Sequence, residues 1–541
     1  MIELANTSLV FVAYAAFALK RLMTYLHVLQ QDDYENSRLM KWVWQHKAFD
    51  KRMSFALLVL GGAQFYIEAF FINFVIFMCF IILAYTEKDP RKNSKKKLVA
   101  TARAHRIFWP SFALVCALGV PSFYYSHPWP WIFTVQMILP SILIVNLFLQ
   151  PFEELIRKKY WNEARAKIQR LQPTVIGITG SFGKTSVKHI LGHILRMNAL
   201  TLITPGSVNT PMGITRIIRE QLEEEHKFFV VEMGAYGPGS IKHLCRLTPP
   251  DIGIITAIGH AHYERFKTLE RVSEAKFELA QAVMAKDGKI IIHERTLRFP
   301  YPRKLKAENP GAFIVCGEPA AIDPEKRKHV SYLSPDDVHI QKVEQRSNGI
   351  ETRLTWNGTT YIVEAPLYGL HHGHNLALAF VTALQLGIES DAIHAALQSL
   401  SQIEHRLQVT QRPDQTVLID DAFNSNPVGF SSALELLGQL KNQGRAILIT
   451  PGMIELGSSH YEAHLKIGEF AGEICDVALV VNSGRIPSFV KGFKNTGGSK
   501  TLIEVDTFQE ASAWVEKNKQ PKDVILIEND LPDMYERIPK M

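Results

Sequence analysis

A strand pattern, a glycine-rich turn and a helical stretch follow one another in the sequence, and this order suits phosphate binding. A buried parallel strand is indicated by the β-branched, apolar run Thr174–Thr179. The turn Gly180–Ser186 follows, and Val187–Met197 has helical character. Backbone N–H groups and the helix dipole would face the phosphates, Lys184 would add a positive charge, and the Thr185 hydroxyl can bind Mg²⁺. The predicted nucleotide-binding residues are Gly180, Ser181, Gly183, Lys184, Thr185 and Ser186.

The spacing of this turn departs from the usual phosphate loop, which has a glycine five residues before the Gly-Lys-Thr tripeptide's own glycine. That position is Ile178 here, whereas glycines stand at 177 and 180. The tripeptide alone is a weak signal because it also occurs by chance. Its place between a strand and a helix is specific, so we predict nucleotide binding.

Three residues further along could hold metal. Glu232 ends the apolar run Phe228–Val231, and an acid at the end of a strand near a phosphate loop commonly binds a divalent cation. Taken alone, His262 is better explained as a buried, hydrogen-bonding histidine. Lys276 alone is better explained as a surface lysine of the helical stretch Ala275–Ala285.

The arrangement Thr179-Gly-Ser-Phe-Gly-Lys-Thr-Ser186 resembles that of the Mur ligase family, the ATP-dependent enzymes that add amino acids during peptidoglycan assembly. Further matches follow in the family's order across residues 174–460. The resemblance implies that Glu232 binds Mg²⁺ and that His262 also binds metal. It further implies that Lys276 is carbamoylated and helps to hold a second Mg²⁺.

Later segments extend the resemblance to the nucleotide. Gly369–Asn375 is similar to a G-x-H-x-x-x-N motif whose asparagine contacts adenine, which implies that role for Asn375. Arg406 is implied to lie near the ATP phosphates. The segment Asp420–Pro427 is similar to the family's DDSYNANP segment, which implies that Asp421 approaches the ribose and that Asn424 also reaches the nucleotide.

The resemblance is nearest to the D-alanyl-D-alanine-adding branch, on the NANP-like residues, Met453–Gly457 and Gly206–Gly213. The last of these resembles the branch's substrate-facing loop and implies that Asn209 and Thr210 bind substrate. Two departures stand against a full match. Residues 1–172 are apolar helices and linker where soluble Mur ligases hold the UDP group, and the acidic Glu528–Asp530 replaces a basic KGSR-like segment.

Composition divides the chain into an apolar N-terminal part and an ordinary α/β remainder. We predict an α-helical membrane region followed by α/β domains. Residues 1–150 form the transmembrane region and residues 151–172 an amphipathic linker helix. Residues 173–404 form a central P-loop ATP-binding domain with a parallel sheet, and residues 405–541 a C-terminal Rossmann-like α/β domain.

Apolar stretches lie at residues 4–19, 53–85, 107–124 and 129–150, and a helix needs roughly 20 apolar residues to span a bilayer. The stretch 53–85 is either a hairpin that turns near residues 61–68 or one long tilted helix. The hairpin gives about five crossings and leaves the basic loops 20–52 and 86–106 on the cytoplasmic side. We therefore expect a multi-pass protein of the cytoplasmic (inner) membrane, with its catalytic domains in the cytoplasm.

Charge and the placement of cysteines and histidines argue against two kinds of function, nucleic-acid binding and a dedicated zinc site. The net charge is +7, but the basic residues gather beside the apolar runs rather than among exposed aromatics of a soluble module, so we expect no nucleic-acid partner. The 5 cysteines are scattered, and the histidines near the predicted site lack zinc-ligand spacing.

The expected activity is an ATP-dependent, amide-forming ligase that activates a carboxylate as an acyl phosphate, with ATP and Mg²⁺ as cofactors. The partners are a small-molecule or lipid-linked carboxylate, an amine and the lipid bilayer. Ligation on a lipid-linked envelope precursor is the main hypothesis. The alternatives are D-alanyl-D-alanine addition to a UDP-linked muramoyl tripeptide and synthesis of an amide polymer such as poly-γ-glutamate. A membrane transporter or signalling ATPase is the hypothesis from another class.

Overall fold

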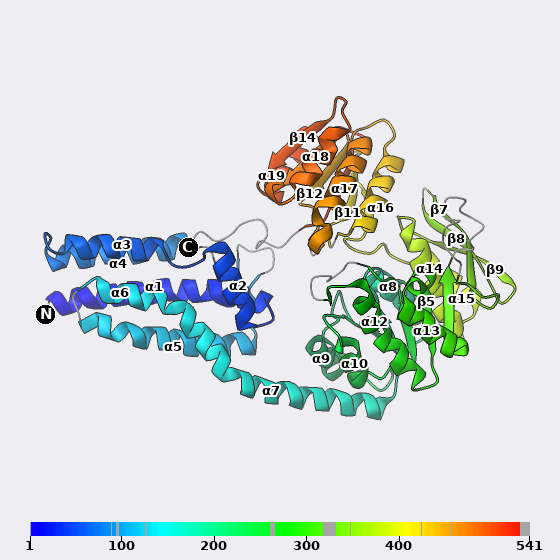
Figure 1. The fold of residues 1–541 in the computed structure, drawn as a ribbon, viewed down its shortest axis with the longest axis horizontal. Helices are drawn as coiled ribbons and strands as arrows, with labels where there is room; N and C mark the ends of the chain where they lie inside the picture. The colour runs from blue at the N-terminus through cyan, green and yellow to red at the C-terminus, as the bar shows by residue number, and fades with distance from the viewer. Residues whose placement is uncertain are drawn as a thin grey trace. The chain divides into compact units, whose positions relative to one another are not determined.

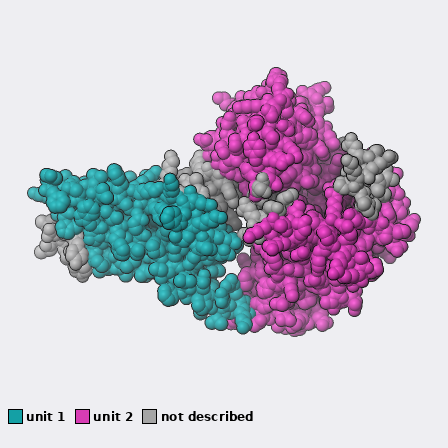
Figure 2. All heavy atoms as spheres, in the orientation of Figure 1, with its two compact units in different colours: residues 1–158, 531–541 teal, residues 159–530 magenta. Residues whose placement is uncertain are grey.

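The computed structural model describes residues 2–87, 89–92, 97–124, 127–259, 266–317, 332–346, 348–423, 425–454 and 456–530. Two compact units are present, residues 1–158 and residues 159–530 (Figures 1 and 2). The first unit is helical, and the second contains two β-sheets. His262 and Asn424 lie outside the described residues.

The first unit is a set of helices that run alongside one another (Figure 1). The hairpin expected between residues 53 and 85 is present as two helices, α3 and α4. The apolar stretch 129–150 is divided between α6 and the start of α7. The bounds are α1 Ile2–Gln31, α2 Asn36–His46, α3 Arg52–Ala63, α4 Ala69–Thr86, α5 Ala102–Tyr124, α6 Trp129–Gln136 and α7 Ile138–Leu171.

Helix α1 is longer than the sequence pattern indicated, because it continues through the basic pair Lys20-Arg21 to Gln31. Leu22, Leu26 and Leu29 extend its buried face beyond that pair. Their spacing is that of one helical face, so apolar packing continues past the charges. The loop expected from residue 20 therefore begins after Gln31.

A buried ion cluster joins the two ends of the α3–α4 hairpin. Arg21 Nη1 lies 2.8 Å from Asp50 Oδ2, and Arg21 Nε lies 3.0 Å from Glu87 Oε1. Thr24 Oγ1 donates to Glu87 Oε1 at 2.7 Å. Asp50 precedes α3 and Glu87 follows α4, so both ends of the hairpin meet α1 at one level.

Three helical stretches are long and apolar enough to cross a membrane, namely Thr7–Gln31, Ala69–Thr86 and Trp129–Leu171, and α3 is a shorter apolar helix. Most of the exposed large hydrophobic side chains among the described residues belong to this unit, including Phe55, Phe71 and Phe148. A soluble monomer rarely exposes so much contiguous apolar surface. The count of five crossings stays a prediction.

Helix α7 continues through Pro151 without a break and carries the chain into the second unit. Ala164 and Ile168 are buried in the core of the second unit. Trp161 stacks on His243 with ring centroids 4.2 Å apart, and Glu163 accepts from Arg219 Nε at 2.7 Å. The end of the predicted linker is thus a packed part of the α/β unit.

The larger sheet of the second unit has the strand order β2-β3-β1-β4-β5-β6-β7-β8-β9. The first six of these strands, and the β6–β7 pair, are parallel. The strands are β1 Thr174–Thr179, β2 Thr201–Ile203, β3 Phe228–Glu232, β4 Ile252–Ile255, β5 Lys289–His293, β6 Phe313–Gly317, β7 Val338–Arg346, β8 Gly349–Trp356 and β9 Thr359–Ala365.

Helices cover both faces of this sheet, since alternate residues of its strands are buried on opposite sides. Ile176 packs with α8, α14 and α15, whereas Val175 packs with α9, α10, α12 and the end of α7. The helices are α8 Lys184–Asn198, α9 Pro211–Gln221, α10 Ser240–Leu247, α12 Leu269–Met284, α13 Pro300–Glu308, α14 His371–Gln385 and α15 Ser390–Gln398.

The sheet is mixed rather than purely parallel as predicted, because β7, β8 and β9 pair antiparallel. The β8–β9 turn consists of Asn357 and Gly358, whose φ angles are 50° and 76°. Positive φ at both turn residues matches the right-handed twist of a hairpin. The predicted parallel sheet is therefore correct only for the part that carries the phosphate loop.

The second sheet has the order β10-β11-β15-β12-β13-β14, and every neighbouring pair except β10–β11 is parallel. Helices α16, α17 and α18 cover one face and α19 the other. Its elements are β10 Gln408–Gln411, β11 Val417–Asp421, α16 Pro427–Leu440, β12 Ala446–Thr450, α17 His460–Ile474, β13 Val477–Val481, α18 Pro487–Asn495, β14 Thr501–Val505, α19 Phe508–Asn518 and β15 Val524–Glu528.

Candidate active site

The predicted phosphate loop lies between the end of β1 and the first residue of α8. Gly180 and Gly183 have φ angles of 154° and 80°. A Cβ at Gly180 would clash with Thr256 Oγ1, and one at Gly183 would lie 2.6 Å from Asn375 Oδ1. Both positions therefore require glycine. The unpaired N–H groups at the start of α8 face this turn and suit an anion.

Ser181 ties the loop to the segment that follows β4. Its N–H donates to Ala257 O at 2.6 Å, and its Oγ donates to Gly259 O at 3.0 Å. The Gly259 N–H donates back to Ser181 Oγ at 2.9 Å. Ser186, also predicted to bind nucleotide, is buried in the first turn of α8. Ser181 thus holds the loop's shape with its side chain.

Lys184 lies inside the loop. Its Nζ donates to Gly180 O at 2.8 Å and to Ser181 O at 3.3 Å. Burial lowers the pKa of Lys184, Glu232 opposes that effect, and the nearby cations Arg406 and Lys188 add to it. The lysine is therefore surrounded by other positive charge, an environment that attracts phosphate.

Glu232, at the end of β3, is the centre of a buried polar network. Its Oε2 accepts from Thr185 Oγ1 at 3.0 Å and from Lys188 Nζ at 2.9 Å, and its Oε1 accepts from Asn209 Nδ2 at 3.1 Å. Burial raises the pKa of Glu232, but Lys188 and Lys184 outweigh it, so the pKa is lower than usual. The carboxylate is therefore ionised beside the phosphate loop.

Lys188 is a site residue that the sequence analysis missed. It is almost fully buried, pairs with Glu232 and also donates to Gly206 O. It stands one helical turn after Lys184 on α8, and this i, i+4 spacing is the signal that could have identified it. Lys188 thus links the carboxylate to the Gly206–Gly213 segment.

The two residues predicted to bind substrate behave differently. Asn209 donates to Glu232, and its Oδ1 accepts from Tyr236 Oη at 2.7 Å. Thr210 is the N-cap of α9, where its side chain accepts from Gly213 N at 3.4 Å. Asn209 therefore joins the network around Glu232, whereas Thr210 begins a helix.

Lys276 is buried on α12, contrary to the surface position favoured when it is considered alone. Burial lowers its pKa well below the usual value, and the charge of Lys184 lowers it further. Lys276 is therefore close enough to the phosphate loop to sense its charge. A buried amine with a depressed pKa loses its proton at a lower pH than a solvated lysine does, and the free amine can act as a nucleophile.

The histidine-rich start of α14 lies against the phosphate loop. Asn375 is buried there beside Gly183. Burial lowers the pKa of His371 to about 4, and Arg406 and His374 add to the effect. His374 stacks on His293 with centroids 4.5 Å apart. His371 is therefore neutral near pH 7, and the described residues contain no cluster of His, Cys, Asp or Glu able to hold a metal.

Arg406 and Asp421 meet at the edge of the second sheet. The Arg406 guanidinium lies over the Phe423 ring at 4.5 Å, and burial lowers its pKa while Asp421, Glu232 and Glu528 raise it. Asp421 Oδ1 accepts from Leu407 N at 3.3 Å. The charges of carboxylates from both sheets therefore act on the Arg406 guanidinium.

Asp421 and Glu528 form a buried acid pair, because β11 and β15 are adjacent parallel strands that align these two residues. Burial raises the pKa of Asp421 to about 6, although Arg406 lowers it. Burial and Asp421 raise the pKa of Glu528 well above its usual value, and Ser425 Oγ donates to it. Such a pair keeps a proton to a higher pH than isolated carboxyl groups do.

Oxygen donors that suit a metal ion lie at the start of α8 and at the end of β3. Mg²⁺ prefers carboxylate and hydroxyl oxygens together with phosphate. Glu232 and Thr185 supply the two protein oxygens within one hydrogen bond of each other and next to the loop. These residues fit Mg²⁺.

Two family models match the chain. The Mur ligase middle domain matches residues 178–383, and the Mur ligase, glutamate ligase domain matches residues 405–528. Together they cover more than half of the chain, and residues 1–177 lie outside both.

Among curated proteins, the UDP-N-acetylmuramoyl-tripeptide–D-alanyl-D-alanine ligase of Mycobacterium leprae is 28% identical over 376 residues, which cover 65% of this chain and 70% of that protein. The same-named ligase of Buchnera aphidicola subsp. Acyrthosiphon pisum is 29% identical over 330 residues, or 61% and 68% of the two chains.

Among solved structures, MurF ligase from Thermotoga maritima in complex with ADP has a TM-score of 0.57 at 24% identity and covers 69% of this chain and 80% of its own. MurF from Acinetobacter baumannii gives a TM-score of 0.57, 24% identity and coverage of 69% and 77%. The fold is shared with both. The chain therefore belongs to the Mur ligase family and is an ATP-dependent, amide-forming ligase.

Proposed function

We propose that the chain joins the terminal carboxylate of a UDP-N-acetylmuramoyl-tripeptide to the amine of D-alanyl-D-alanine. The names of the curated relatives supply these substrates. The supporting observation is that Glu232 hydrogen-bonds both to Thr185 of the phosphate loop and to Asn209 of the segment expected to face substrate. A phosphate and an acceptor carboxylate can therefore be held next to each other.

In the first step, a carboxylate oxygen attacks the γ-phosphorus of ATP. The bond from that phosphorus to the bridging oxygen breaks, and ADP leaves with the electron pair. Negative charge builds on the transferring phosphoryl oxygens, and Lys184 and Arg406 are proposed to neutralise it. Positioning and electrostatics supply the catalysis, so no side-chain nucleophile is needed.

In the second step, the amine nitrogen attacks the acyl carbon of the acyl phosphate. The bond from that carbon to the phosphate oxygen breaks, phosphate leaves, and the nitrogen gives up a proton. The products are an amide, ADP and inorganic phosphate. Asn375, which lies beside Gly183, is proposed to contact the adenine. Asp421 is proposed to contact the ribose side of the nucleotide, together with Asn424, which lies outside the described residues.

Mg²⁺ is proposed to bind Glu232 and Thr185, with His262 as a further ligand. When bound, the ion supplies positive charge against the phosphates. Lys276 is proposed to react with CO₂, so that a nitrogen–carbon bond forms and a proton is lost. The resulting carbamate is an anion that suits a second metal. The low pKa of the Lys276 amine supports this reaction.

The first unit is proposed to anchor the enzyme at the cytoplasmic face of the inner membrane. Its apolar helices and exposed Phe55, Phe71 and Phe148 support this location. They also favour a second candidate substrate, a lipid-linked carboxylate at the bilayer surface. Glu528, which pairs with Asp421, belongs to the acidic segment that stands where the branch has basic residues, so amines that lack a carboxylate are also candidates.

The test is an amide-formation assay with the full-length protein in detergent. UDP-linked and lipid-linked muramoyl tripeptides are each offered with D-alanyl-D-alanine, and with amines that lack a carboxylate, while ADP and product mass are followed. We expect ADP formation that requires both a carboxylate substrate and an amine. We also expect an amide product with the UDP-linked tripeptide. ATP hydrolysis that ignores every acceptor would contradict a ligase, and amide formation only with the lipid-linked tripeptide would replace the first substrate by the second.

A further inference from the structure

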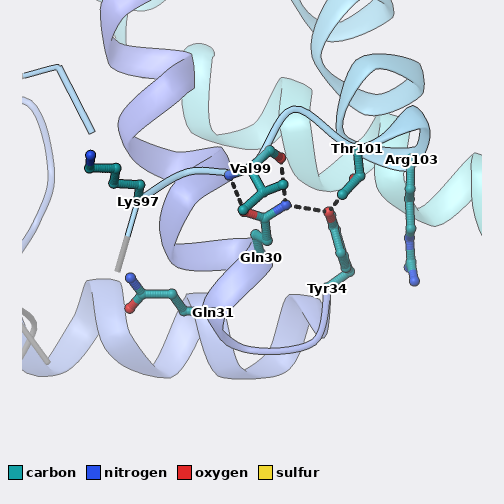
Figure 3. Close-up of a pocket in the computed structure, with 7 residues that line it drawn as sticks. All are labelled: Gln30, Gln31, Tyr34, Lys97, Val99, Thr101 and Arg103. Atoms are coloured by element: carbon teal, nitrogen blue, oxygen red, sulfur yellow. Dashed lines mark hydrogen bonds between the residues drawn. The ribbon is translucent and has the colours of Figure 1, made fainter. Parts of the chain in front are cut away.

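A cavity of about 370 Å³ lies in the first unit, where the end of α1 and the following turn meet the segment before α5 (Figure 3). None of its lining residues belongs to the ligase site. Among the described residues, no carboxylate lines it. The lining residues are Gln30, Gln31, Tyr34, Lys97, Val99, Thr101 and Arg103.

The wall of the cavity is held by a closed hydrogen-bond network. Gln30 Nε2 donates to Val99 O at 2.9 Å, and Val99 N donates to Gln30 Oε1 at 2.9 Å. Gln30 Nε2 also donates to Tyr34 Oη at 3.0 Å, and the Tyr34 and Thr101 hydroxyls lie 3.3 Å apart (Figure 3). The segment 97–103 is therefore fixed against α1, with a cationic residue at each end.

The charge of these two cations is not balanced locally. The Arg103 guanidinium lies over the Tyr34 ring at 4.1 Å, and its Nε is buried without a hydrogen-bond partner. Lys97 makes no ion pair within the described part of the chain. Glu153, whose charge reaches Arg103, is engaged by Arg106 Nε at 2.6 Å. The cavity thus has a positive excess and an unused donor.

The position of the cavity identifies the kind of anion. The candidate span Thr7–Gln31 ends at Gln31, which lines the cavity, and α5 becomes apolar after Arg106. The cavity thus lies where the apolar stretches of two helices end, which would be the level of the lipid headgroups if this unit spans a bilayer. Val99 and Tyr34 add apolar surface beside the charges. A phosphate attached to an apolar body fits such a site.

We propose that this cavity binds the phosphate of an anionic lipid headgroup, with Lys97 and Arg103 as the cationic partners. The inference rests on the membrane location given under the proposed function. A polybasic segment beside a membrane span binds anionic lipid through each of its charges. Here two of the cations are held at a preformed cavity, so binding depends on these positions and not on total charge.

The test uses the full-length protein in nanodiscs of phosphatidylcholine, to which phosphatidylglycerol is added. Bound lipid is counted by native mass spectrometry, and thermal unfolding is recorded. We expect phosphatidylglycerol to bind and to raise the Tm. The double variant Lys97→Ala/Arg103→Gln should bind it about 10- to 30-fold more weakly, while its ligase turnover is unchanged.

The matched control is Lys51→Ala/Arg52→Gln, which removes the same charge from exposed residues outside the cavity. Equal weakening in both double variants would overturn a specific site. Inorganic phosphate that competes at millimolar concentration would assign the cavity to a soluble anion and overturn the lipid. If Arg103→Gln does not fold, lipid binding by the single variant Lys97→Ala is compared with that of the wild type instead. A wild-type protein that does not sediment with membranes refutes the membrane location, whereas a membrane-bound protein without lipid selectivity refutes only this site.

Discussion

The buried pair of Lys188 and Glu232 decides whether a carboxylate can stay charged beside the phosphate loop. Both side chains are almost fully removed from solvent, and their atoms lie 2.9 Å apart. Taking away one partner of such a pair leaves an uncompensated buried charge, which costs about 3–5 kcal/mol. Lys188 also holds the Gly206 carbonyl, so its loss affects the segment that carries Asn209 as well.

For Lys188→Met we therefore expect a marked fall in Tm and a loss of about 100-fold or more in substrate-dependent phosphate release. The double variant Lys188→Met/Glu232→Gln should recover Tm but not activity, because it removes the stranded charge and also the carboxylate. Lys304→Met, at an exposed position on α13, is the control. Thermal unfolding and a phosphate assay measure both effects, and a Lys188→Met enzyme with normal activity would refute the role given to the pair.

The acid pair Asp421 and Glu528 predicts a pH dependence of stability. Both pKa values are raised in the folded chain, to about 6 for Asp421 and well above the usual value for Glu528. The folded state thus holds protons that the unfolded state has released above about pH 4. Folding stability should fall as the pH rises from about 4 through 6, because the native state binds more protons there.

In Glu528→Gln this fall should be smaller, and the variant should be more stable than the wild type above pH 6, by on the order of 1–3 kcal/mol. Tm values from pH 5 to pH 8 measure the difference between the two proteins. Glu462→Gln, at an exposed position, should match the wild type. Parallel pH curves for wild type and Glu528→Gln would show that the pair does not share a proton.

Sequence patterns located Lys184, Thr185 and Glu232 because strand, turn and helix are local features. They missed Lys188, whose role depends on which face of α8 is buried. The pairing of Asp421 with Glu528 could not be predicted either, because β11 and β15 are far apart in the sequence and adjacent only in the sheet. Lys276 looked like a surface lysine until the packing of α12 placed it in the interior.

Among the secondary-structure elements, the parallel part of the larger sheet was predicted from the sequence, whereas the antiparallel strands β7, β8 and β9 were not. The strand β1 and the α3–α4 hairpin lie where the apolar runs indicated. The Asn357-Gly358 pair between β8 and β9 is a strong hairpin signal in the sequence, and it lies within the antiparallel part of the sheet. Pro151 suggested a break, yet α7 continues, because packing against the α/β unit stabilises its second half.

Helix α7 therefore belongs to the fold of the ligase, and Ile168→Asp should destabilise it. Ile168 is nearly buried in a core formed with Ile214 and Leu222. A buried, unpaired carboxylate costs several kcal/mol, so we expect faster proteolysis within residues 159–172 and a lower Tm. Lys158→Asp, at an exposed position on the same helix, is the control. Equal protease resistance in the two variants would mean that the helix is not docked.

At the scale of the whole molecule, an apolar helical unit precedes an α/β ligase. If the first unit spans the bilayer, the full-length protein should sediment with membranes and should not be extracted from them by alkaline carbonate. A chain that begins at residue 159 should be soluble and still bind ATP, because the phosphate loop and its neighbours lie in the second unit. Release of the full-length protein by carbonate would contradict a membrane-spanning unit.

The central claim is that the chain activates a carboxylate as an acyl phosphate, and an isotope measurement tests it most directly. The acceptor is supplied with ¹⁸O in its reacting carboxylate, and the released phosphate is analysed by mass spectrometry. We expect one ¹⁸O atom to move into phosphate for every amide formed, and Lys184→Ala to abolish the transfer. Released phosphate without ¹⁸O, while amide is formed, would contradict an acyl-phosphate intermediate.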